Sequence, residues 1–314
     1  MTENQKIYEL IIIGGGPAGV AAAVYAARKK LNSLVLTKEW GGQSVVSATI
    51  ENWIGEIEIK GSELAQKLEK NVKFYQSETF EIKDFQEVKK LEETENGLFK
   101  VTTLFGEEFL SQTVIIATGS KRRKLPAKAA DKFEHKGLTY CASCDGPVFT
   151  GKDVAVIGGG NSAFEAASQL MAYCKSVTIV NRTDKFKAEP TMVENVLKNE
   201  NVKTIMNAET TEVFGDDFVK GIKYTDRETG EEKELAVEGI FVEIGAIPAT
   251  DFIQEGLVEK NQYNQIVVDC KTMRTSKKGI WAAGDVVDGI YHQNSIAIGD
   301  GTKAIEDLYI YLKA

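Results

Sequence analysis

The feature that most constrains the fold is a glycine-rich turn that occurs twice, as GGGPAG at residues 14–19 and as GGGNSA at residues 158–163. In each copy a short apolar run of β type precedes the turn, and an alanine-rich stretch and a second β-type run follow it. A G-x-G-x-x-G or G-x-G-x-x-A turn between a strand and a helix is typical of dinucleotide-binding units. One such turn is weak evidence, but two in the same context predict two nucleotide-binding units.

The small residues of each turn have different roles. The first glycine of the motif permits the tight bend, the second lets a pyrophosphate approach the backbone, and the last small residue lets the helix pack against the strand. The helix N-terminus adds the positive end of its dipole. The residues predicted to contact nucleotide are Gly14, Gly16, Pro17, Ala18 and Gly19 in the first turn and Gly158, Gly160, Asn161, Ser162 and Ala163 in the second.

A polar region with alternating apolar residues follows each unit, over about residues 79–109 and 212–237. The first region contains the hairpin signal Asn96-Gly97, and the second turns at Thr229-Gly230. This pattern predicts two β-meanders. Each meander is followed by an apolar strand that ends in glycine, as the chain would require to return to the parent sheet.

The order of these segments predicts an α/β protein with two Rossmann-like dinucleotide-binding domains, the second inserted in the first and each carrying a β-meander. Residues 1–118 and 246–314 are predicted to form the first domain. Residues 119–245 are predicted to form the inserted domain, so the chain would cross between the domains near Gly119 and Gly245.

Composition limits the partners and the compartment. The chain has 314 residues and a formal net charge of −8, so it lacks the basic surface of a nucleic-acid binder. No stretch approaches the roughly 18 apolar residues of a membrane span, and the apolar run at residues 10–13 is too short for a signal peptide. We therefore expect a cytoplasmic protein with no nucleic-acid or membrane partner, in a compartment where thiols stay reduced.

Two of the four cysteines, Cys141 and Cys144, stand two residues apart and directly before Asp145. Such a pair in the cytosol indicates redox or metal chemistry. Zinc usually takes four ligands, but Cys174 and Cys270 are far apart in the chain and are expected to be buried hydrophobic residues. No metal site is therefore expected. A redox pair fits better, with Asp145 exchanging the proton that each step moves; alternatively, Asp145 only caps a short helix.

With both turns and the cysteine pair in view, the chain resembles the low-molecular-weight thioredoxin reductases along essentially its whole length. It is also similar to the reductase core of the flavoprotein subunit of alkyl hydroperoxide reductase. The resemblance rests on seven blocks in the order typical of the family: GGGPAG, WGGQ, IENW, ATGS, CASCDGP, GGGNSA and AAGDVVD. It implies FAD at the first turn, NADPH or NADH in the inserted domain, a thioredoxin- or glutaredoxin-like protein partner, and a homodimer.

The resemblance also implies the residues of the flavin pocket. Asp285 matches the acid that meets the ribityl chain, and residues 292–294 would lie near the ring; alternatively, Asp285 caps a helix that begins around Ser295. The residues expected around FAD beyond the first turn are Thr37, Lys38, Gly42, Gln43, Asn52, Ile82, Ala117, Thr118, Gly119, Gly284, Asp285, His292, Gln293 and Asn294.

By the same resemblance, electrons pass from the nucleotide to the flavin, then to the Cys141–Cys144 disulfide, and then to a protein disulfide. Cys144 would face the flavin and Cys141 would attack the substrate, with Asp145 as the proton carrier. The inserted domain would swing about a hinge at Gly119-Ser120 and Gly245-Ala246.

The nucleotide-selecting segment, VNRTDKFKA at residues 180–188, departs from the family pattern. Asn181 and Thr183 replace a histidine and an arginine of the basic block that grips a 2′-phosphate, and no acid stands at the strand end to hold the ribose of NADH. NADPH, NADH and ferredoxin therefore stay open as donors. The NAD(P)H contacts predicted beyond the second turn are Asn181, Arg182, Lys187, Ile244 and Gly245.

Two features are candidates for partner binding. The basic run KRRK at residues 121–124 would steer an acidic thioredoxin-like protein, or is an ordinary solvated loop. Val148 and Phe149 would form an exposed apolar contact, or pack inside. Rival functions are a ferredoxin-dependent reductase, a small-molecule dithiol oxidase and a non-enzymatic flavoprotein. A peroxide-reductase role would need a separate carrier protein.

Overall fold

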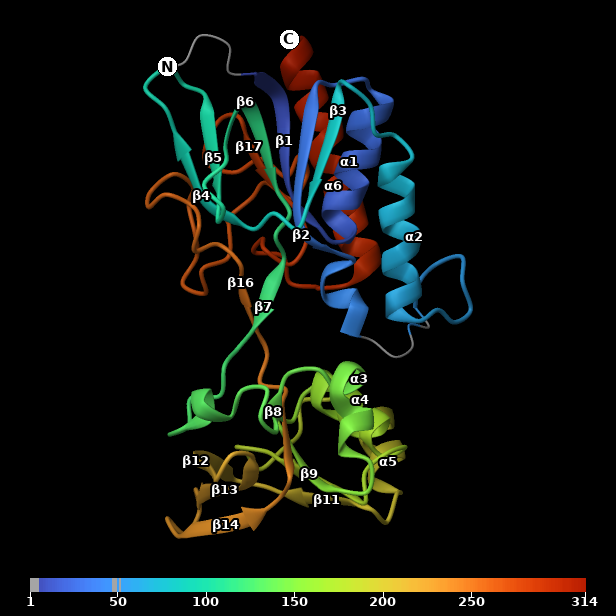
Figure 1. The fold of residues 1–314 in the computed structure, drawn as a ribbon, viewed down its shortest axis with the longest axis vertical. Coiled ribbons are helices and arrows are strands. Elements are labelled where there is room, and N and C mark those ends of the chain that lie inside the picture. Colours follow the sequence, from blue (N-terminus) through green and yellow to red (C-terminus); the bar gives the residue numbers. More distant parts are fainter. Residues whose placement is uncertain (1–5, 47–49, 51) are drawn as a thin grey trace. The chain divides into compact units, whose positions relative to one another are not determined.

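The computed structural model describes residues 6–46, 50 and 52–314, apart from the side chains of Val46, Ser143 and Cys144. The chain divides into two compact units. Unit 1 is built from both ends of the chain, up to Lys121 and from Ile247, and unit 2 is the continuous segment Arg122–Ala246. In Figure 1 unit 1 carries the blue to teal and the orange to red ribbons, and unit 2 the green to yellow-orange ones.

Unit 1 is centred on a mixed sheet of seven strands with the order β3-β2-β1-β6-β5-β4 and β17 paired to β6. The pairs among β3, β2, β1, β6 and β17 are parallel, whereas β4 and β5 form an antiparallel extension. The strands are β1 (Ile7–Gly15), β2 (Ser33–Trp40), β3 (Phe80–Asp84), β4 (Val88–Glu93), β5 (Phe99–Thr103), β6 (Glu108–Ile116) and β17 (Ile280–Ala282).

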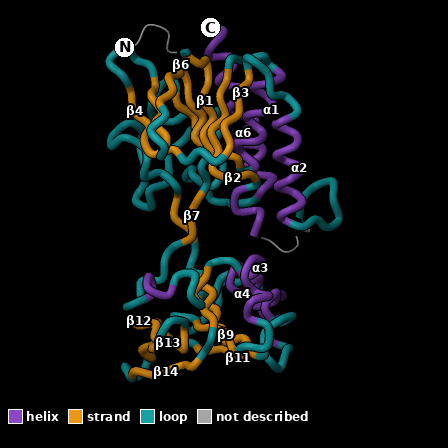
Figure 2. The backbone as a smooth tube through the Cα atoms, viewed as in Figure 1, coloured by secondary structure: helices purple, strands orange, loops and turns teal. Residues whose placement is uncertain are grey.

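Three helices cover one face of this sheet, as Figure 2 shows. They are α1 (Pro17–Arg28), α2 (Gly61–Lys73) and α6 (Asn294–Lys313). The helices α1 and α6 approach closely because Gly301 has no side chain: a Cβ there would lie 2.1 Å from the carbonyl oxygen of Ala18. The central apolar residues of β1, β2 and β6, among them Ile11, Val35 and Ile115, are fully buried and form the core of the unit.

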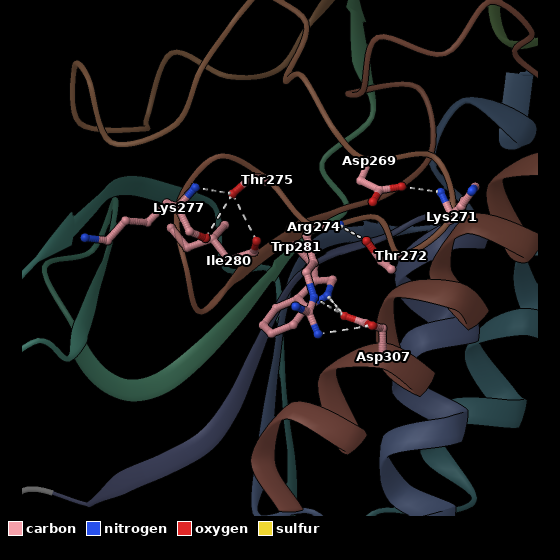
Figure 3. Close-up of polar contacts among 9 residues, drawn as sticks. All are labelled: Asp269, Lys271, Thr272, Arg274, Thr275, Lys277, Ile280, Trp281 and Asp307. Atoms are coloured by element: carbon pink, nitrogen blue, oxygen red, sulfur yellow. Dashed lines mark hydrogen bonds and ion pairs between the residues drawn. The ribbon is translucent and has the colours of Figure 1, made fainter. Parts of the chain in front are cut away.

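A polar cluster fixes α6 to the sheet edge at β17, as Figure 3 shows. Asp307 of α6 accepts hydrogen bonds from Arg274 Nε at 2.5 Å and Arg274 Nη2 at 3.2 Å. The indole Nε1 of the buried Trp281 donates to the same carboxylate at 3.0 Å. A two-pronged guanidinium–carboxylate pair holds both partners in one orientation, so the C-terminal helix is aligned with the strand that leads into residues 283–292.

Unit 2 repeats the layout in smaller form, with a five-stranded parallel sheet in the order β11-β10-β9-β15-β8 and a three-stranded antiparallel sheet, β12-β13-β14. The strands are β8 (Leu138–Thr139), β9 (Asp153–Ile157), β10 (Ser176–Val180), β11 (Val202–Ile205), β12 (Ala208–Gly215), β13 (Val219–Asp226), β14 (Glu232–Ala236) and β15 (Gly239–Val242). The helices are α3 (Ala142–Asp145), α4 (Asn161–Leu170) and α5 (Pro190–Leu197). Its short 3-10 helices are η2 (Ala130–Phe133) and η3 (Gly146–Phe149), whereas η1 (Gly42–Val46) lies in unit 1.

The chain crosses between the units twice, through β7 (Ser120–Arg122) and β16 (Ala246–Pro248), and these two strands pair with each other. Gly119 and Gly245 beside them have φ values of 63° and 95°. Apart from the adjacent residues, no heavy atom in the described part of the chain lies within 4 Å of the Cβ that either glycine lacks. Backbone conformation, rather than space, therefore favours glycine at both positions.

Some expectations from the sequence need correction. The first predicted meander includes β3, but β3 pairs in parallel with β2 and is reached through α2, so only β4, β5 and β6 are connected as antiparallel neighbours. Cys270 was expected to be buried at the end of a strand, yet it is exposed in a turn. In the part of the chain that is described, no helix has both the length and the apolar character of a membrane span.

Candidate functional site

The first glycine turn joins β1 to α1, and each of its motif glycines meets a different environment. Gly14 has a φ of 123°, and a Cβ there would lie 2.1 Å from the carbonyl oxygen of Ala117. A Cβ at Gly19 would lie 2.0 Å from the carbonyl oxygen of Gly14. At Gly16, in contrast, the nearest atom to a Cβ would be 3.9 Å away. Protein packing therefore explains Gly14 and Gly19, whereas Gly16 faces open space.

The N-terminus of α1 is available to an anion. Gly16 is its N-cap and Pro17 its first residue, and no side chain of the described residues caps the first turn. The first turn also lacks an acidic residue. Backbone N–H groups and the positive end of the helix dipole are therefore directed at the space beside Gly16, as a pyrophosphate site requires.

The end of β2 differs from the prediction for the adenosine end of FAD. Thr37 is buried, and its hydroxyl donates to the carbonyl oxygen of Glu39 at 2.6 Å. Lys38 is exposed and lies 2.8 Å from Glu87. The Thr37 hydroxyl therefore stabilises its own loop rather than reaching outward. Ile82, also predicted as a contact, is half-buried in β3 and pairs with Val35.

Loops distant in sequence meet at the N-terminal end of α6. Asn52 Nδ2 donates to Gln293 Oε1 at 3.0 Å, and the Ser44 hydroxyl donates to Asn294 Oδ1 at 2.8 Å. The structure therefore brings together predicted flavin contacts from the IENW and 292–294 segments. It adds Ser44, directly after the WGGQ block, which sequence reasoning missed. Its position one residue after Gln43 was the only available signal.

The other predicted flavin residues follow the ends of β6 and β17. The Thr118 hydroxyl donates to the carbonyl oxygen of Ala249 at 2.8 Å, and Ala249 N donates to Gly119 O at 3.0 Å. His292 Nδ1 lies 3.5 Å from Asp285 Oδ1. The N-cap of α6 is Gln293, and no side chain caps this helix, so Asp285 is not its cap.

A cavity of about 350 Å³ opens beside these residues within unit 1. Its walls combine three predicted flavin contacts with residues of α6 and of the turn that carries Cys270. The lining residues are Val268, Cys270, Met273, Gly284, Asp285, Val287, Asp288, Gly289, Ile290, Tyr291, His292, Ile296, Ala297, Asp300 and Lys303.

The second glycine turn repeats the geometry of the first. Gly158 has a φ of 144°, and a Cβ there would lie 2.2 Å from the carbonyl oxygen of Glu243. Gly160 has no atom within 4 Å of the Cβ position, and it is the N-cap of α4, which lacks a side-chain cap and an acid in its first turn. Of the other predicted contacts, Ser162 is exposed, whereas Ala163 is buried against Gly158.

The loop after β10 is stabilised by hydrogen bonds from the buried side chain of Asn181. Asn181 is 6% exposed, and its Nδ2 donates to the carbonyl oxygens of Thr183 and Lys185, both at 2.9 Å. Asn161 Oδ1 likewise accepts from the backbone N of Glu189 at 2.8 Å. These amides therefore shape the nucleotide-selecting loop, and Asn181 does not offer its N–H groups outward to a ribose.

Cations, in contrast, are exposed on this loop. Arg182 and Lys187 are exposed, and Lys187 N donates to Gly159 O at 2.7 Å, which fixes the loop beside the turn. Arg227, at the end of β13, was missed by sequence reasoning. Its Nη1 donates to the carbonyl oxygen of Arg182 at 3.3 Å. No periodicity connects residues so far apart, so only the folded chain reveals this neighbour.

The cysteine segment lies in unit 2 at the end of β8. Cys141 is disulfide-bonded, and the side chain of its predicted partner Cys144 lies outside what the structure describes. The Thr139 hydroxyl donates to Asp145 Oδ2. Cys141 N donates to Thr139 Oγ1 at 3.4 Å, and Asp145 N donates to Cys141 O at 3.1 Å. The structure therefore brings the carboxylate and the redox cysteine into one hydrogen-bonded turn.

The remaining cysteines have different surroundings. Cys174 is buried, and burial raises the pKa of its thiol to about 11, which makes it inert at neutral pH. Cys270 is exposed. Among the described residues, no group of three or more His, Cys, Asp or Glu is placed to hold a metal ion.

A buried ion pair that sequence reasoning missed lies at the end of β15. Glu243 is 4% exposed at its side chain, and Arg122 Nη1 donates to its Oε2 at 2.5 Å. Burial raises the pKa of Glu243 to about 7, and nearby Glu165 adds to this effect, while Arg122 opposes it. Predicted contacts Ile244 and Gly245 follow directly, and Gly245 O accepts from Arg123 N at 3.0 Å.

Val148 and Phe149, the two candidate contacts for a protein partner, differ in exposure. Val148 is 69% exposed. Phe149 is buried, with its ring centroid 5.2 Å from that of Phe241. Val148 alone therefore offers an apolar contact at this point.

Residues 8–301 match the pyridine nucleotide-disulphide oxidoreductase family. An NADH dehydrogenase of Bacillus subtilis is 41% identical, covering 98% of this chain and 59% of the relative. An alkyl hydroperoxide reductase protein of Escherichia coli is 40% identical, covering 98% of this chain and 59% of the relative. The chain thus spans 57–60% of the length of the curated relatives.

Solved structures match over their full length. Thioredoxin reductase from Lactococcus lactis superposes with a TM-score of 0.90 at 35% identity, covering 98% of this chain and 99% of that one. Thioredoxin reductase from T. acidophilum gives a TM-score of 0.89 at 38% identity, covering 99% and 100% of the two chains. These similarities confirm the predicted fold of two Rossmann-like dinucleotide-binding domains.

Proposed function

Because this chain belongs to the pyridine nucleotide-disulphide oxidoreductase family, we propose that it is a flavin-dependent disulfide reductase. Membership implies FAD and NAD(P)H as its cofactors. With both cofactors bound, NAD(P)H would supply electrons that FAD relays to the Cys141–Cys144 disulfide, and the resulting dithiol would reduce a thioredoxin- or glutaredoxin-like protein. The observation that carries this proposal is the disulfide at Cys141 beside Asp145, within the unit that also holds the second glycine turn.

The residues present fit FAD in unit 1. The open space beside Gly16 and the uncapped N-terminus of α1 suit its pyrophosphate. Asn52, Ser44 and Asp285 supply polar groups on the loops that meet at α6. When bound, FAD would relay two electrons between the nicotinamide and the disulfide. The matching space at Gly160 and the uncapped α4 suit the pyrophosphate of NAD(P)H in unit 2.

In the second half of the proposed reaction, the protein's own side chains do the chemistry. The Cys141 thiol gives its proton to Asp145 as its sulfur attacks the partner's disulfide, and the released partner thiolate takes that proton. The Cys144 sulfur then attacks Cys141 in the mixed disulfide. This step re-forms the protein's disulfide and releases the second partner thiol, which takes the proton lost from Cys144.

The partner is proposed from the relatives. The full-length structural matches are thioredoxin reductases, so a separate thioredoxin-like protein is the first candidate. Exposed Val148 beside the cysteine turn supports a protein rather than a small-molecule acceptor. A homodimer and a cytoplasmic location complete the proposal.

The test is an anaerobic titration of the purified protein, which should be yellow, with NADPH, NADH and reduced ferredoxin in turn. Loss of flavin absorbance names the donor. Thioredoxin disulfide should then restore the colour in the wild type but not in a Cys141→Ser, Cys144→Ser double variant. A colourless protein, or a double variant with full activity toward thioredoxin, would refute the proposal.

A peroxide-linked reductase is the second candidate, because the alkyl hydroperoxide reductase protein of E. coli is 40% identical to this chain. The same titration separates the two candidates when thioredoxin is replaced by a peroxidase with its own disulfide. Faster reoxidation of the flavin by the peroxidase than by thioredoxin would favour the second.

A further inference from the structure

The Asp145 carboxylate is held by a chain of hydrogen bonds that runs through Thr139. The Thr139 hydroxyl donates to Asp145 Oδ2, and its oxygen accepts the backbone N–H of Cys141 at 3.4 Å. Asp145 N in turn donates to Cys141 O at 3.1 Å. The acid and the redox cysteine are therefore linked by the backbone and by one intervening hydroxyl.

The direction of this chain is fixed by the chemistry of a hydroxyl. A threonine has one O–H proton and two acceptor sites. Because an ionised carboxylate only accepts, the proton of Thr139 goes to Asp145, and its lone pairs remain for the Cys141 N–H. Thr139 can therefore bridge the two groups only through its hydroxyl.

The position of Thr139 makes this bridge rigid. It is the last residue of β8 and pairs with Phe241 of β15 in the parallel sheet. Thr139 is 8% exposed, so water has little access to it. Within the part of the chain that the structure describes, no other side chain forms a hydrogen bond or ion pair with the Asp145 carboxylate. The sheet thus sets the place of the acid through the hydroxyl of Thr139.

We propose that Thr139 is a positioning residue of the disulfide site. Its buried hydroxyl fixes the Asp145 carboxylate beside the Cys141 backbone, so that the acid is in place for the proton that thiol–disulfide exchange moves. This inference rests on the proposed function, which gives Asp145 its proton-carrying role. It adds the residue that orients the acid, which the sequence motif did not identify.

The test measures reduction of the Cys141 disulfide by dithiothreitol in the full-length protein, with the new thiols counted by alkylation and mass spectrometry. One dithiothreitol thiolate attacks the protein disulfide, the released protein thiolate takes a proton, and ring closure of oxidised dithiothreitol releases the second thiol. This readout needs neither the flavin nor a protein partner. Donor-dependent reduction of ferricyanide, measured in parallel, reports whether each variant is folded and holds its cofactors.

Thr139→Val keeps the branched shape and removes the hydroxyl, whereas Thr139→Ser keeps the hydroxyl. In Thr139→Val, dithiothreitol should reduce the Cys141 disulfide about ten-fold more slowly than in the wild type. General acid–base catalysis typically contributes about 10²–10⁴-fold to a rate, and a misplaced acid should lose part of that contribution. Thr139→Ser should stay within about three-fold of the wild type. Thr178→Val, a buried threonine of β10 in the same unit, is the matched control and should not change the rate.

Two outcomes overturn the inference: a Thr139→Val rate equal to the wild type, or a Thr139→Ser rate as slow as that of Thr139→Val. An Asp145→Asn variant shows whether only the positioning role of Thr139 is wrong or whether the proton-carrying role of Asp145 in the proposed function is wrong too. If Asp145→Asn is slow and Thr139→Val is not, only the positioning role fails. If Asp145→Asn matches the wild type, the proton-carrying role fails, and the role of Thr139 fails with it.

Discussion

Arg122 and Glu243 are buried together at the point where the chain enters and leaves unit 2, with Arg122 Nη1 at 2.5 Å from Glu243 Oε2, and they form an ion pair when Glu243 is ionised. Arg122 Nε is also buried, without a hydrogen-bond partner among the described residues. A carboxylate out of water is costly even when paired. Burial therefore raises the pKa of Glu243 from 4.5 to about 7, against the opposing effect of Arg122.

This raised pKa predicts that the stability of unit 2 falls as pH rises. The folded state keeps a proton on Glu243 up to about pH 7, whereas the unfolded chain releases it near pH 4.5. The contribution of the protonated Glu243 to the free energy of unfolding is therefore fully present below pH 4.5. It is lost as pH rises through 7, and the total loss is about 3 kcal/mol at most. Glu243→Gln should show a smaller fall in thermal midpoint between pH 5.5 and 8 than the wild type. Exposed Glu200→Gln, which does not act on the pKa of Glu243, is the control, and equal slopes in wild type and Glu243→Gln would contradict the prediction.

The open space beside Gly16 predicts a variant that folds but does not hold FAD. Gly16→Ala meets no protein atom closer than 3.9 Å and needs no unusual φ, so the fold should be unchanged. The added methyl group would occupy the pyrophosphate position and weaken FAD binding about ten-fold or more, which equals about 1.4 kcal/mol. Gly299→Ala in α6 is the matched control. Flavin absorbance and circular dichroism measure both effects, and a fully yellow Gly16→Ala protein would argue against this site.

The exposed cations beside the second turn predict the choice of nucleotide. If the donor is NADPH, Arg182→Ala should raise its KM about ten-fold, because a charge-assisted hydrogen bond contributes about 1.5–3 kcal/mol. The KM for NADH should not change. Arg227→Ala tests the second cation, whose Nη1 lies 3.3 Å from Arg182 O. Equal effects of Arg182→Ala on both nucleotides would show that no 2′-phosphate is bound here.

Three of the four basic side chains at residues 121–124 form ion pairs within the protein, so they are less available to steer an acidic partner. Lys121 forms an ion pair with Asp251, and Arg122 one with Glu243. Lys124 is paired with Glu134 and Asp131. Among the described residues, Arg123 is the one cation of the four without a side-chain partner.

Arg123→Ser should therefore carry most of any steering effect. We expect a higher KM for thioredoxin at low ionic strength and convergence with the wild type above about 0.5 M salt, because salt screens charges on an exposed surface. Lys121→Ser is the matched control and should have a smaller effect. No change in KM for Arg123→Ser at any salt concentration would reject steering by this run.

The glycine at the second crossing predicts a variant with slow turnover. Gly245 has a φ of 95°, which a β-branched side chain adopts only under strain. Gly245→Val should slow disulfide reduction without loss of FAD if the crossing must change conformation in each cycle. Stopped-flow rates and flavin absorbance check this. Gly230→Val, at a positive-φ hairpin turn of unit 2, is the matched control for strain alone, and equal slowing in both variants would remove the hinge argument.

Much of the fold could be predicted from the two glycine turns, because their steric demands are local. The approaches of Gly14 to Ala117 and of Gly158 to Glu243 are the same contact in both units. The helix α2 and the parallel strand β3 were harder to predict, since a short half-buried strand has the same alternation as a hairpin strand. Only its pairing with β2 separates the two.

The parts of the candidate site that lie in one sequence motif could be predicted from their residue types. The parts formed by side chains from distant segments could not. The cysteine pair and Asp145 stand in one block of sequence. Ser44 with Asn294, Arg122 with Glu243, and Arg227 beside Arg182 join residues that no local pattern connects. Asn181 was interpreted as a ribose contact, yet its amide N–H groups are used by its own loop.

The interrupted layout of unit 1 has a consequence for how the protein is made. All of unit 2 is contiguous, so its residues leave the ribosome before β17 and α6 exist. Until then, β6 lacks the neighbour that completes its outer pairing, and α1 lacks the helix that packs against Ala18. The inserted unit can therefore fold first during synthesis, while the part of the nascent parent sheet that α6 covers stays exposed until that last helix emerges.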